Sequence, residues 1–456
     1  MKIYPHYPKP VKKKISQFMT FFIKGSSWLD GVYERSYTMK MGVVKMPGIL
    51  VYIPNQPELI HRILVTETKC FPKHTLLHET FRPLLGDSVF TTNGSIWKRR
   101  RDFIQPSFEM TRISHVFDLM HTSAKEMLIR LDTMADGRYH NIDKEMTFVT
   151  ADIIFRTILS SKLRVKEGQK IIDSFVSFQE TSAKIAIQKM FLIPKIFRYF
   201  TLEKRHRSSG ERIRESLATI IRPRYNAMQS NQKDNHQDIL SSLLKAVDKD
   251  TGKPFKMEEV LDEVAMLFLA GHETTASSMS WTLYLLGLYP KEQEKAYQEL
   301  LCICGNEAFS VSNIKELHFI SNVFKESLRL YPPVSFLPRV SARDTTMRDK
   351  VVKKGTAMII SPWLIHRNAL YWEDPHMFNP HRFDDPSAIP KDSYIPFGLG
   401  PRSCVGERFA MQETVLLLAS ILRKFRIELE EGFIPDIVGR LTTRSLNGIS
   451  VKLVKR

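Results

Sequence analysis

The chain has 456 residues, of which 43% are hydrophobic, an ordinary share for a globular protein with a large core. Its formal net charge of +18 comes mostly from scattered basic residues, without the motif or interleaved aromatics of a nucleic-acid module. An acidic protein partner or an anionic membrane surface explains this charge at least as well. Four cysteines are too few for a disulfide scaffold, so we expect a reducing, cytoplasmic setting.

The first stretch of the chain, residues 1–41, is expected to pack on the main domain or to lie on a membrane surface. Four apolar residues recur there at helical spacing behind three lysines: Ile15, Phe18, Met19 and Phe22. Such a stripe is typical of a helix packed on a domain, and it also suits peripheral membrane contact. We find no run of 18 apolar residues and no signal-peptide pattern, so no segment is expected to span a membrane.

The remainder, residues 42–456, is predicted to be one large domain, mainly α with a smaller β-rich region. Helical periodicity dominates it, and no linker or internal repeat divides it. In chain order we predict a hairpin over 42–53 turned at Pro47-Gly48, a helix from Pro57, a long loop over 71–93, and helices through most of 110–229 with a break at Pro194. A helix over 257–288, a helix ending at Leu330, strands in 334–341 and 355–360, a helix over 408–425 and a hairpin turned at Asn447-Gly448 follow.

Trp97 and Arg101 lie four residues apart, so on a helix they share one face. An indole N–H beside a guanidinium suits an anionic group such as a carboxylate. The alternative is a core tryptophan next to a solvated arginine.

The long apolar helix carries a polar interruption, Ala270-Gly271-His272-Glu273-Thr274-Thr275, near its middle. A glycine inside a helix costs about 1 kcal/mol relative to alanine. Helices with such interruptions often widen to admit a ligand or water. We therefore predict a break at a binding site, and a merely irregular helix is the alternative.

Glu326 and Arg329 are three residues apart and can meet on one helical face. Their neighbours are apolar, which indicates partial burial, and a buried ion pair benefits from a further charged partner. Arg382 is the candidate for that partner.

A cysteine stands among three glycines in Phe397-Gly398-Leu399-Gly400-Pro401-Arg402-Ser403-Cys404-Val405-Gly406. A thiolate needs this surrounding, because it must be shielded from water and approached by backbone N–H groups. The loop predicts that Cys404 is the axial ligand of a haem iron.

Five separated motifs agree with one family. Residues 397–406 resemble the F-x-x-G-x-R-x-C-x-G loop of the cytochrome P450 monooxygenases. Four further stretches, in the family's order, are similar to its W-x-x-x-R, A-G-x-[DE]-T-T, E-x-x-R and P-x-R-F motifs: Trp97 to Arg101, Ala270 to Thr275, Glu326 to Arg329 and Pro380 to Phe383. The lack of a hydrophobic anchor resembles the soluble bacterial members.

The resemblance implies roles for these residues. Cys404 holds the iron of haem b, with Phe397 and Gly398 packed beside the sulfur. Glu273 and Thr274 deliver the protons that O₂ activation needs, and a buried structural network lies behind the haem. The propionates are bound by Arg402, Trp97, Arg101 and Arg339, and the network is formed by Glu326, Arg329 and Arg382.

The implied function is insertion of one atom of O₂ into a lipophilic substrate, by hydroxylation or epoxidation, in a monomeric protein. No reductase domain follows Cys404, so NAD(P)H electrons are expected through a ferredoxin or flavodoxin-like partner. We expect it to bind a positive face formed by part of the cluster Lys98, Arg99 and Arg100 together with Arg408. A peroxide-driven enzyme and a non-catalytic haem sensor or carrier are the alternatives, and the Glu273–Thr274 pair argues against both. The substrate pocket is expected to include Phe81, Phe90, Met266, Leu267, Ala270, Val334, Phe336 and Leu446.

Overall fold

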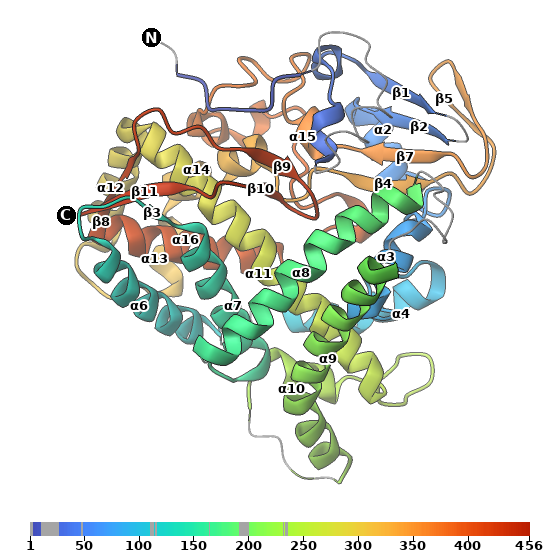
Figure 1. Cartoon of the computed structure of the whole chain (residues 1–456), viewed down its shortest axis with the longest axis horizontal. Helices are drawn as coiled ribbons and strands as arrows, with labels where there is room; N and C mark the ends of the chain where they lie inside the picture. Colours follow the sequence, from blue (N-terminus) through green and yellow to red (C-terminus); the bar gives the residue numbers. More distant parts are fainter. Residues whose placement is uncertain are drawn as a thin grey trace. The chain divides into compact units, whose positions relative to one another are not determined.

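The computed structural model describes residues 3–10, 27–46, 49–109, 114, 116–163, 165–190, 200–230, 232 and 236–456. The predicted N-terminal stripe, the Pro47-Gly48 turn and the break at Pro194 lie outside these residues. The fold is mainly α with a smaller β region, as predicted (Figure 1). Two compact units are formed, one by Met1–Phe71, His121–Val149 and Thr274–Arg456, the other by Pro72–Met120 and Thr150–Glu273.

A four-stranded sheet lies in the first unit, with strand order β1-β2-β7-β4 (Figure 1). The predicted hairpin is confirmed, since β1 (Met41–Met46) and β2 (Ile49–Pro54) pair antiparallel. β7 (Ala357–Ile360) runs parallel to β2 and antiparallel to β4 (Leu337–Val340). The helix α2 (Pro57–His61) begins with proline at its first turn, and a π-helical turn, η3 (Arg62–Thr66), continues it. Ile60 and Ile63 pack from these turns into the core under the sheet.

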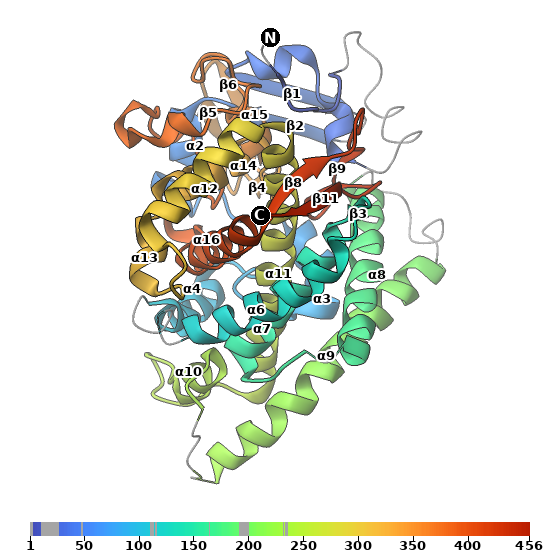
Figure 2. The ribbon, with the colours of Figure 1, turned by 90° about the vertical axis from the view of Figure 1, so that its left-hand side faces the viewer.

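Several helices of the first unit pack on α16 (Glu407–Lys424), which is almost wholly buried along its middle. α12 (Pro290–Cys304) and α14 (His318–Leu330) both pack on it (Figure 2). Short helices complete the set: α13 (Val311–Glu316), α15 (Pro362–Ile365) and the 3₁₀ helix η6 (Pro380–Phe383).

The predicted hairpin at Asn447-Gly448 is wrong. β10 (Thr443–Ser445) pairs with β9 (Ile437–Gly439), whereas β11 (Ser450–Lys455) pairs with β8 (Phe425–Leu429) and β3 (His140–Asn141). A turn does lie there, with Gly448 at φ +73°. The Asn447 side chain accepts the N–H of Asp436 at 2.8 Å, which ties the turn to the segment before β9, so the chain passes from one sheet to another.

The second unit is helical. α8 (Val165–Met190) and α9 (Phe200–Gln229) lie side by side, and α3 (Thr75–Leu85) packs on both (Figures 1 and 2). α4 (Gly94–Ile104), α10 (Ile239–Lys245) and the first part of α11 (Met257–Leu288) complete it. Residues of α6 (Phe117–Met134) and α7 (Asp143–Leu159) are divided between the two units.

α3 corrects the prediction of a loop over 71–93. His74 caps this helix, because its Nδ1 accepts the N–H of Leu76 at 3.1 Å, and Gly86 ends it at φ +49°. A histidine cap and a proline inside the helix, at Pro83, are weak sequence signals for a helix.

α11 has the bounds that the sequence predicted, but the predicted break at Gly271 is wrong, because the α-helix runs through residues 270–275. Packing explains the glycine instead: a Cβ there would stand 2.5 Å from Cδ1 of Ile154 in α7. Among the residues described, no helix is both long and apolar enough to cross a bilayer.

Candidate functional site

The loop before α16 is a closed turn that presents Cys404. The Cys404 N–H donates to the carbonyl of Phe397 at 2.8 Å, and the Gly398 N–H donates to the carbonyl of Ile395 at 3.1 Å. Gly398 and Gly400 both stand in the left-handed region, at φ +74° and +71°. The Cys404 thiol is exposed, and the residue two positions later caps α16. A cysteine ahead of a helix N-terminus is favoured as the thiolate.

Two contacts that the sequence did not reveal hold this loop in place. A Cβ on Gly400 would stand 2.2 Å from the carbonyl oxygen of Leu64, so only glycine permits the approach to the turn η3. On the other side, the Ile395 N–H donates to Nε2 of His366 at 2.8 Å. Burial, with the nearby Arg329, keeps the pKa of His366 well below its ordinary value, so the ring is neutral and accepts this bond.

The structure brings Glu326, Arg329 and Arg382 together. Arg329 donates from Nε and Nη2 to the Glu326 carboxylate at 2.7 and 2.8 Å, with both side chains 0% exposed. The Arg382 Nε lies 3.4 Å from Glu326 Oε1. Arg329 also donates to the carbonyls of His366, Pro375 and Met377, which fixes the segment leading to the cysteine loop.

Trp97 and Arg101 both lie on α4 of the second unit, half-buried, and the Arg101 Nε donates to Gln105 Oε1 at 3.1 Å. The cysteine loop belongs to the first unit. Trp97 and Arg101 therefore lie on one helix, as predicted. That they bind the same anionic group stays a prediction.

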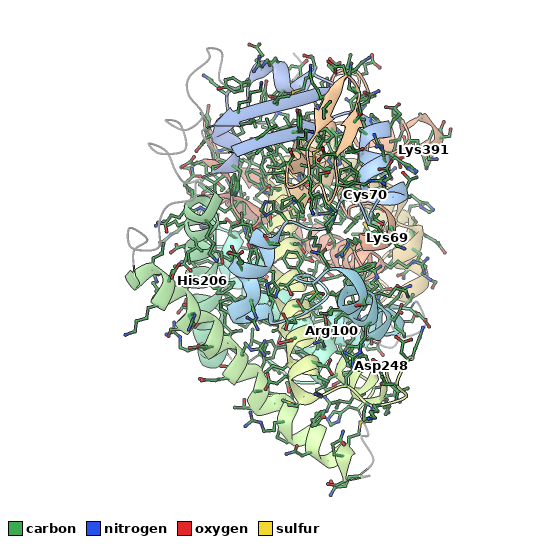
Figure 3. The ribbon with its side chains drawn as sticks, turned by 90° about the vertical axis from the view of Figure 1, so that its right-hand side faces the viewer. Lys69, Cys70, Arg100, His206, Asp248 and Lys391 are labelled. Atoms are coloured by element: carbon green, nitrogen blue, oxygen red, sulfur yellow. The ribbon has the colours of Figure 1, made fainter. Side chains whose placement is uncertain are left out.

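Of the cluster Lys98, Arg99 and Arg100, part of which was predicted to form a basic face, Arg100 is too buried to belong to that face. Arg100, labelled in Figure 3, is only 4% exposed. Acidic side chains of α11 lie around it. Arg99 forms ion pairs with Asp248 and Glu259. Lys98 stays exposed and pairs with Asp102 at 2.6 Å. The sequence spacing did not reveal that the acidic partners lie some 150 residues further along the chain.

Glu273 and Thr274 differ in exposure, since Glu273 is 4% exposed and Thr274 is half-buried. Ala270 is exposed and lies four residues before Thr274, on the same helical face. The Ser278 hydroxyl donates to the Thr274 carbonyl at 2.8 Å. A half-buried threonine therefore stands next to a buried glutamate in the helix α11.

Of the predicted pocket residues, Phe81 and Phe90 meet edge to face in the second unit, with ring centroids 5.6 Å apart. The others are scattered in the two units and differ in exposure. Met266 and Leu267 are buried, Val334 and Phe336 are half-buried, and Leu446 is 48% exposed.

A family model described as Cytochrome P450 matches residues 27–450. The chain belongs to the cytochrome P450 family. It is accordingly an oxidoreductase, a monooxygenase, and the family implies haem and O₂.

Three curated relatives of this P450 come from animals and a plant. Human "Cytochrome P450 4V2" is 27% identical over 442 residues, which cover 93% of this chain and 83% of the human protein. "Cytokinin hydroxylase" of Arabidopsis thaliana is 29% identical over 401 residues, covering 87% and 77%. "Leukotriene-B4 omega-hydroxylase 3" of Mus musculus is 28% identical over 425 residues, covering 89% and 80%. These relatives give no support to the expected likeness to soluble bacterial members.

Two arginines of the first unit, the buried Arg339 and the half-buried Arg402, fit the propionates of the haem that a P450 binds. Arg339 on β4 is 5% exposed, and burial, with Arg402 nearby, lowers its pKa to about 10. Burial lowers the pKa of Arg402 to about 10 as well. Neighbouring cations out of water are costly unless an anion lies with them. The haem propionates would supply such an anion, and the two arginines lie in the same unit as Cys404.

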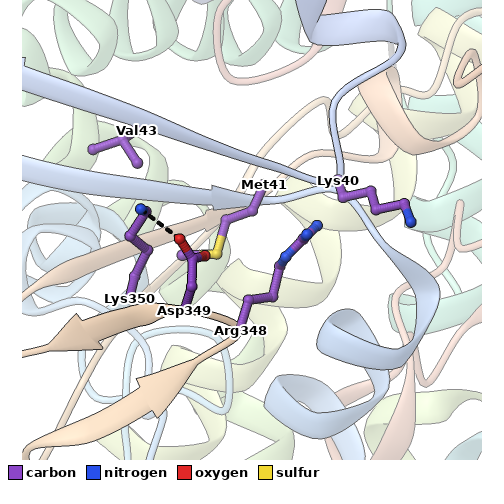
Figure 4. Close-up of a pocket in the computed structure, with 6 residues that line it drawn as sticks. All are labelled: Lys40, Met41, Val43, Arg348, Asp349 and Lys350. Carbon is purple, nitrogen blue, oxygen red and sulfur yellow. Dashed lines mark hydrogen bonds and ion pairs between the residues drawn. The ribbon is translucent and has the colours of Figure 1, made fainter.

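A surface cavity of about 340 Å³ lies between β1 and the turn that joins β5 (Thr345–Met347) to β6 (Lys350–Val352) (Figure 4). None of the predicted site residues lines it, and its charged lining differs from an apolar substrate pocket. It is lined by Lys40, Met41, Val43, Arg348, Asp349 and Lys350.

Proposed function

We propose that this P450 hydroxylates a lipophilic organic substrate with O₂, using electrons from a separate protein. One observation carries the proposal: the exposed Cys404 thiol ends a closed turn ahead of α16, in a chain of the P450 family. Two relatives are named as hydroxylases, which favours hydroxylation over epoxidation.

Haem, when bound, supplies the iron at which O₂ is activated. Cys404 is the proposed iron ligand, and Phe397 and Gly398 shape the protein around its sulfur. Arg339 and Arg402 are the proposed propionate ligands from the first unit, and Trp97 and Arg101 those from the second. Glu326, Arg329 and Arg382 hold the segment that leads to the cysteine loop.

Thr274 and Glu273 are proposed to move protons. A hydroxyl can accept one hydrogen bond and donate another, so Thr274 can hold a proton at a chosen place. Once Thr274 has given up that proton, the carboxyl group of Glu273 supplies the next one. Burial of Glu273 limits the water that enters with the proton.

The substrate is proposed to be apolar, with Phe81 and Phe90 as the aromatic part of its pocket. The edge-to-face pair offers a flat hydrocarbon surface. A leukotriene, named for the mouse relative, and a cytokinin, named for the plant relative, are the reference substrates with which a screen would start.

The electron donor is proposed to be an acidic ferredoxin or flavodoxin-like protein that carries electrons from NAD(P)H. Arg408, at the start of α16 and exposed, is the cation of the predicted face that remains accessible in the first unit. An exposed cation of this kind accelerates encounter with an acidic partner.

The test is the spectrum of the reduced CO complex. We expect the red-shifted Soret band of thiolate ligation, its loss in Cys404→Ser, and its retention in Cys302→Ser, which changes another exposed cysteine. A spectrum typical of histidine ligation would refute the iron ligand. Product formation with peroxide alone, at the rate seen with a reductant, would favour the peroxide-driven alternative, and neither O₂ consumption nor product with any ligand would favour the sensor.

A further inference from the structure

Two adjacent acidic side chains in the first part of α11, Asp262 and Glu263, hold the loop between α3 and α4. The Asp87 N–H donates to Asp262 Oδ2 at 3.0 Å, and the Val89 N–H donates to Glu263 Oε1 at 3.0 Å. The Asp262 and Glu263 side chains are 10% and 0% exposed. The hydrogen bonds are therefore formed in a protected place, where they are stronger than on the surface.

This close contact requires glycine at position 86. Its φ is +49°, and a Cβ there would stand 1.9 Å from Asp262 Oδ1. No side chain fits between the loop and the carboxylate, so the loop lies directly on α11 only because residue 86 is glycine.

Arginines from two other helices contact these two acidic side chains. Arg214 of α9 donates from Nη1 to Asp262 Oδ1 at 2.8 Å. Arg100 of α4 places Nη2 3.6 Å from Asp262 Oδ2 and Nε 3.8 Å from Glu263 Oε1. Three helices thus determine where the two loop amides are bound.

The residue after Val89 is Phe90, and its position follows from this attachment. Lys73 donates from Nζ to the Phe90 carbonyl at 2.6 Å, and the same Nζ lies 4.5 Å from the centre of the Phe90 ring. The backbone of Lys73 is joined to the Asn93 side chain by two bonds of 3.0 Å. The loop is closed at its base, so a shift of the Val89 amide is passed to Phe90 and to its partner Phe81.

We propose that Asp262 and Glu263 are positioning residues, which set where Phe90 stands and thereby which substrate shapes this P450 accepts. The proposal rests on the proposed function, in which Phe81 and Phe90 line the substrate pocket. Neither carboxylate touches the substrate; each acts through a backbone amide of the loop.

The first experiment compares Gly86→Ala with Gly94→Ala in the haem-loaded full chain. Both glycines are left-handed, at φ +49° and +62°, but a Cβ on Gly94 meets nothing within 4 Å. Hydrogen exchange of the 86–93 peptide should accelerate roughly tenfold in Gly86→Ala, and Gly94→Ala should leave it unchanged, because only the first substitution pushes the loop from Asp262.

Glu263 is tested separately, without steric change in the loop. Glu263→Gln keeps an oxygen that accepts the Val89 N–H and should retain slow exchange, whereas Glu263→Met fills the space without an acceptor and should lose it. Glu263→Met also removes one of the acidic side chains around the buried Arg100, so the double variant Glu263→Met/Arg100→Met serves if the single one does not fold.

Ligand selectivity is read from the Soret shift with two probes, imidazole and 1-dodecylimidazole. In Gly86→Ala and Glu263→Met, the dissociation constant for the long probe should change by roughly tenfold, while that for imidazole stays within about twofold. Wild-type exchange in both variants would overturn the proposal, and so would faster exchange with unchanged binding of both probes. A CO spectrum without thiolate character would instead refute the proposed function and leave the exchange result standing.

Discussion

Glu263 and Arg100 face each other inside the second unit, with 3.8 Å between Glu263 Oε1 and Arg100 Nε. Burial raises the pKa of Glu263 to about 8, and the neighbouring carboxylate of Asp262 adds to this, although Arg100, the Val89 N–H and Lys73 oppose it. The carboxyl group therefore carries a proton at neutral pH. The attraction between Arg100 and an ionised Glu263 is smaller than the free-energy cost of burying the ionised carboxylate.

The stability of the protein should consequently depend on pH through Glu263. The folded protein retains this proton up to about pH 8, whereas an ordinary glutamate in the unfolded chain, with a pKa of 4.5, loses it much earlier. The stabilising contribution of the proton is complete below pH 4.5 and is lost as the pH rises to 8. The unfolding temperature of the wild type, minus that of Glu263→Gln, should fall over this window and level off above it. A difference independent of pH would contradict a proton on Glu263.

Gly400→Ala should weaken haem binding by displacing the cysteine loop. The substitution adds about 1–2 kcal/mol of left-handed strain, and its Cβ would also clash with the Leu64 carbonyl, at 2.2 Å. Gly432→Ala is the matched control, since Gly432 has φ +72° and a Cβ there meets nothing within 4 Å. Haem content per protein, measured from the Soret absorbance, should drop in the first variant and hold in the second. Equal losses would assign the effect to backbone strain alone.

The sequence predicted the parts of this structure that depend on local periodicity and on motifs. The helix α11 has its predicted bounds because its apolar residues are continuous, and the motif spacing places Glu326 and Arg329 on one face of α14. Local pattern did not predict contacts between distant segments. The burial of Arg100 depends on carboxylates more than 150 residues away in α11.

The same limit explains the errors at the turns. The role of Gly400 depends on Leu64, and the Asn447-Gly448 turn is decided by Asp436, outside the window in which a hairpin is judged. The helix α3 was missed because a histidine caps it and a proline lies inside it. Side-chain exposure at Thr274 and Ala270 likewise follows from packing and not from helical spacing.

Arg329→Ala should destabilise the protein severely. The guanidinium forms two bonds with Glu326 and donates to three backbone carbonyls, all protected from water. Breaking a buried pair from one side typically costs about 3–5 kcal/mol, because the remaining charge is uncompensated. The free energy of unfolding should fall by this amount. Arg382→Ala should cost less, since its nitrogen lies 3.4 Å from the carboxylate and its side chain is 13% exposed; equal losses would contradict a central role for Arg329.

Arg408→Glu should slow reduction by an acidic ferredoxin, more at low salt than at high salt. Screening shortens the reach of the charge from about 30 Å at 0.01 M salt to about 8 Å at 0.15 M. Stopped-flow reduction under CO measures the rate. Lys354→Glu, which reverses another exposed cation of the first unit, is the control. The same salt-dependent slowing in both variants would indicate an effect of net charge and not of a docking site.

Thr274→Ala should leave haem binding intact and divert electrons from product to hydrogen peroxide. Without the hydroxyl, a proton is not held where reduced oxygen needs it, and a loss of general acid catalysis typically costs about 10²–10⁴ in rate. The ratio of product formed to NAD(P)H consumed should fall, with peroxide accounting for the difference. Thr282→Ala is the control, because that hydroxyl lies two turns further along α11 and donates to the Ser278 carbonyl at 2.7 Å. Unchanged coupling in Thr274→Ala would remove the proton role from Thr274.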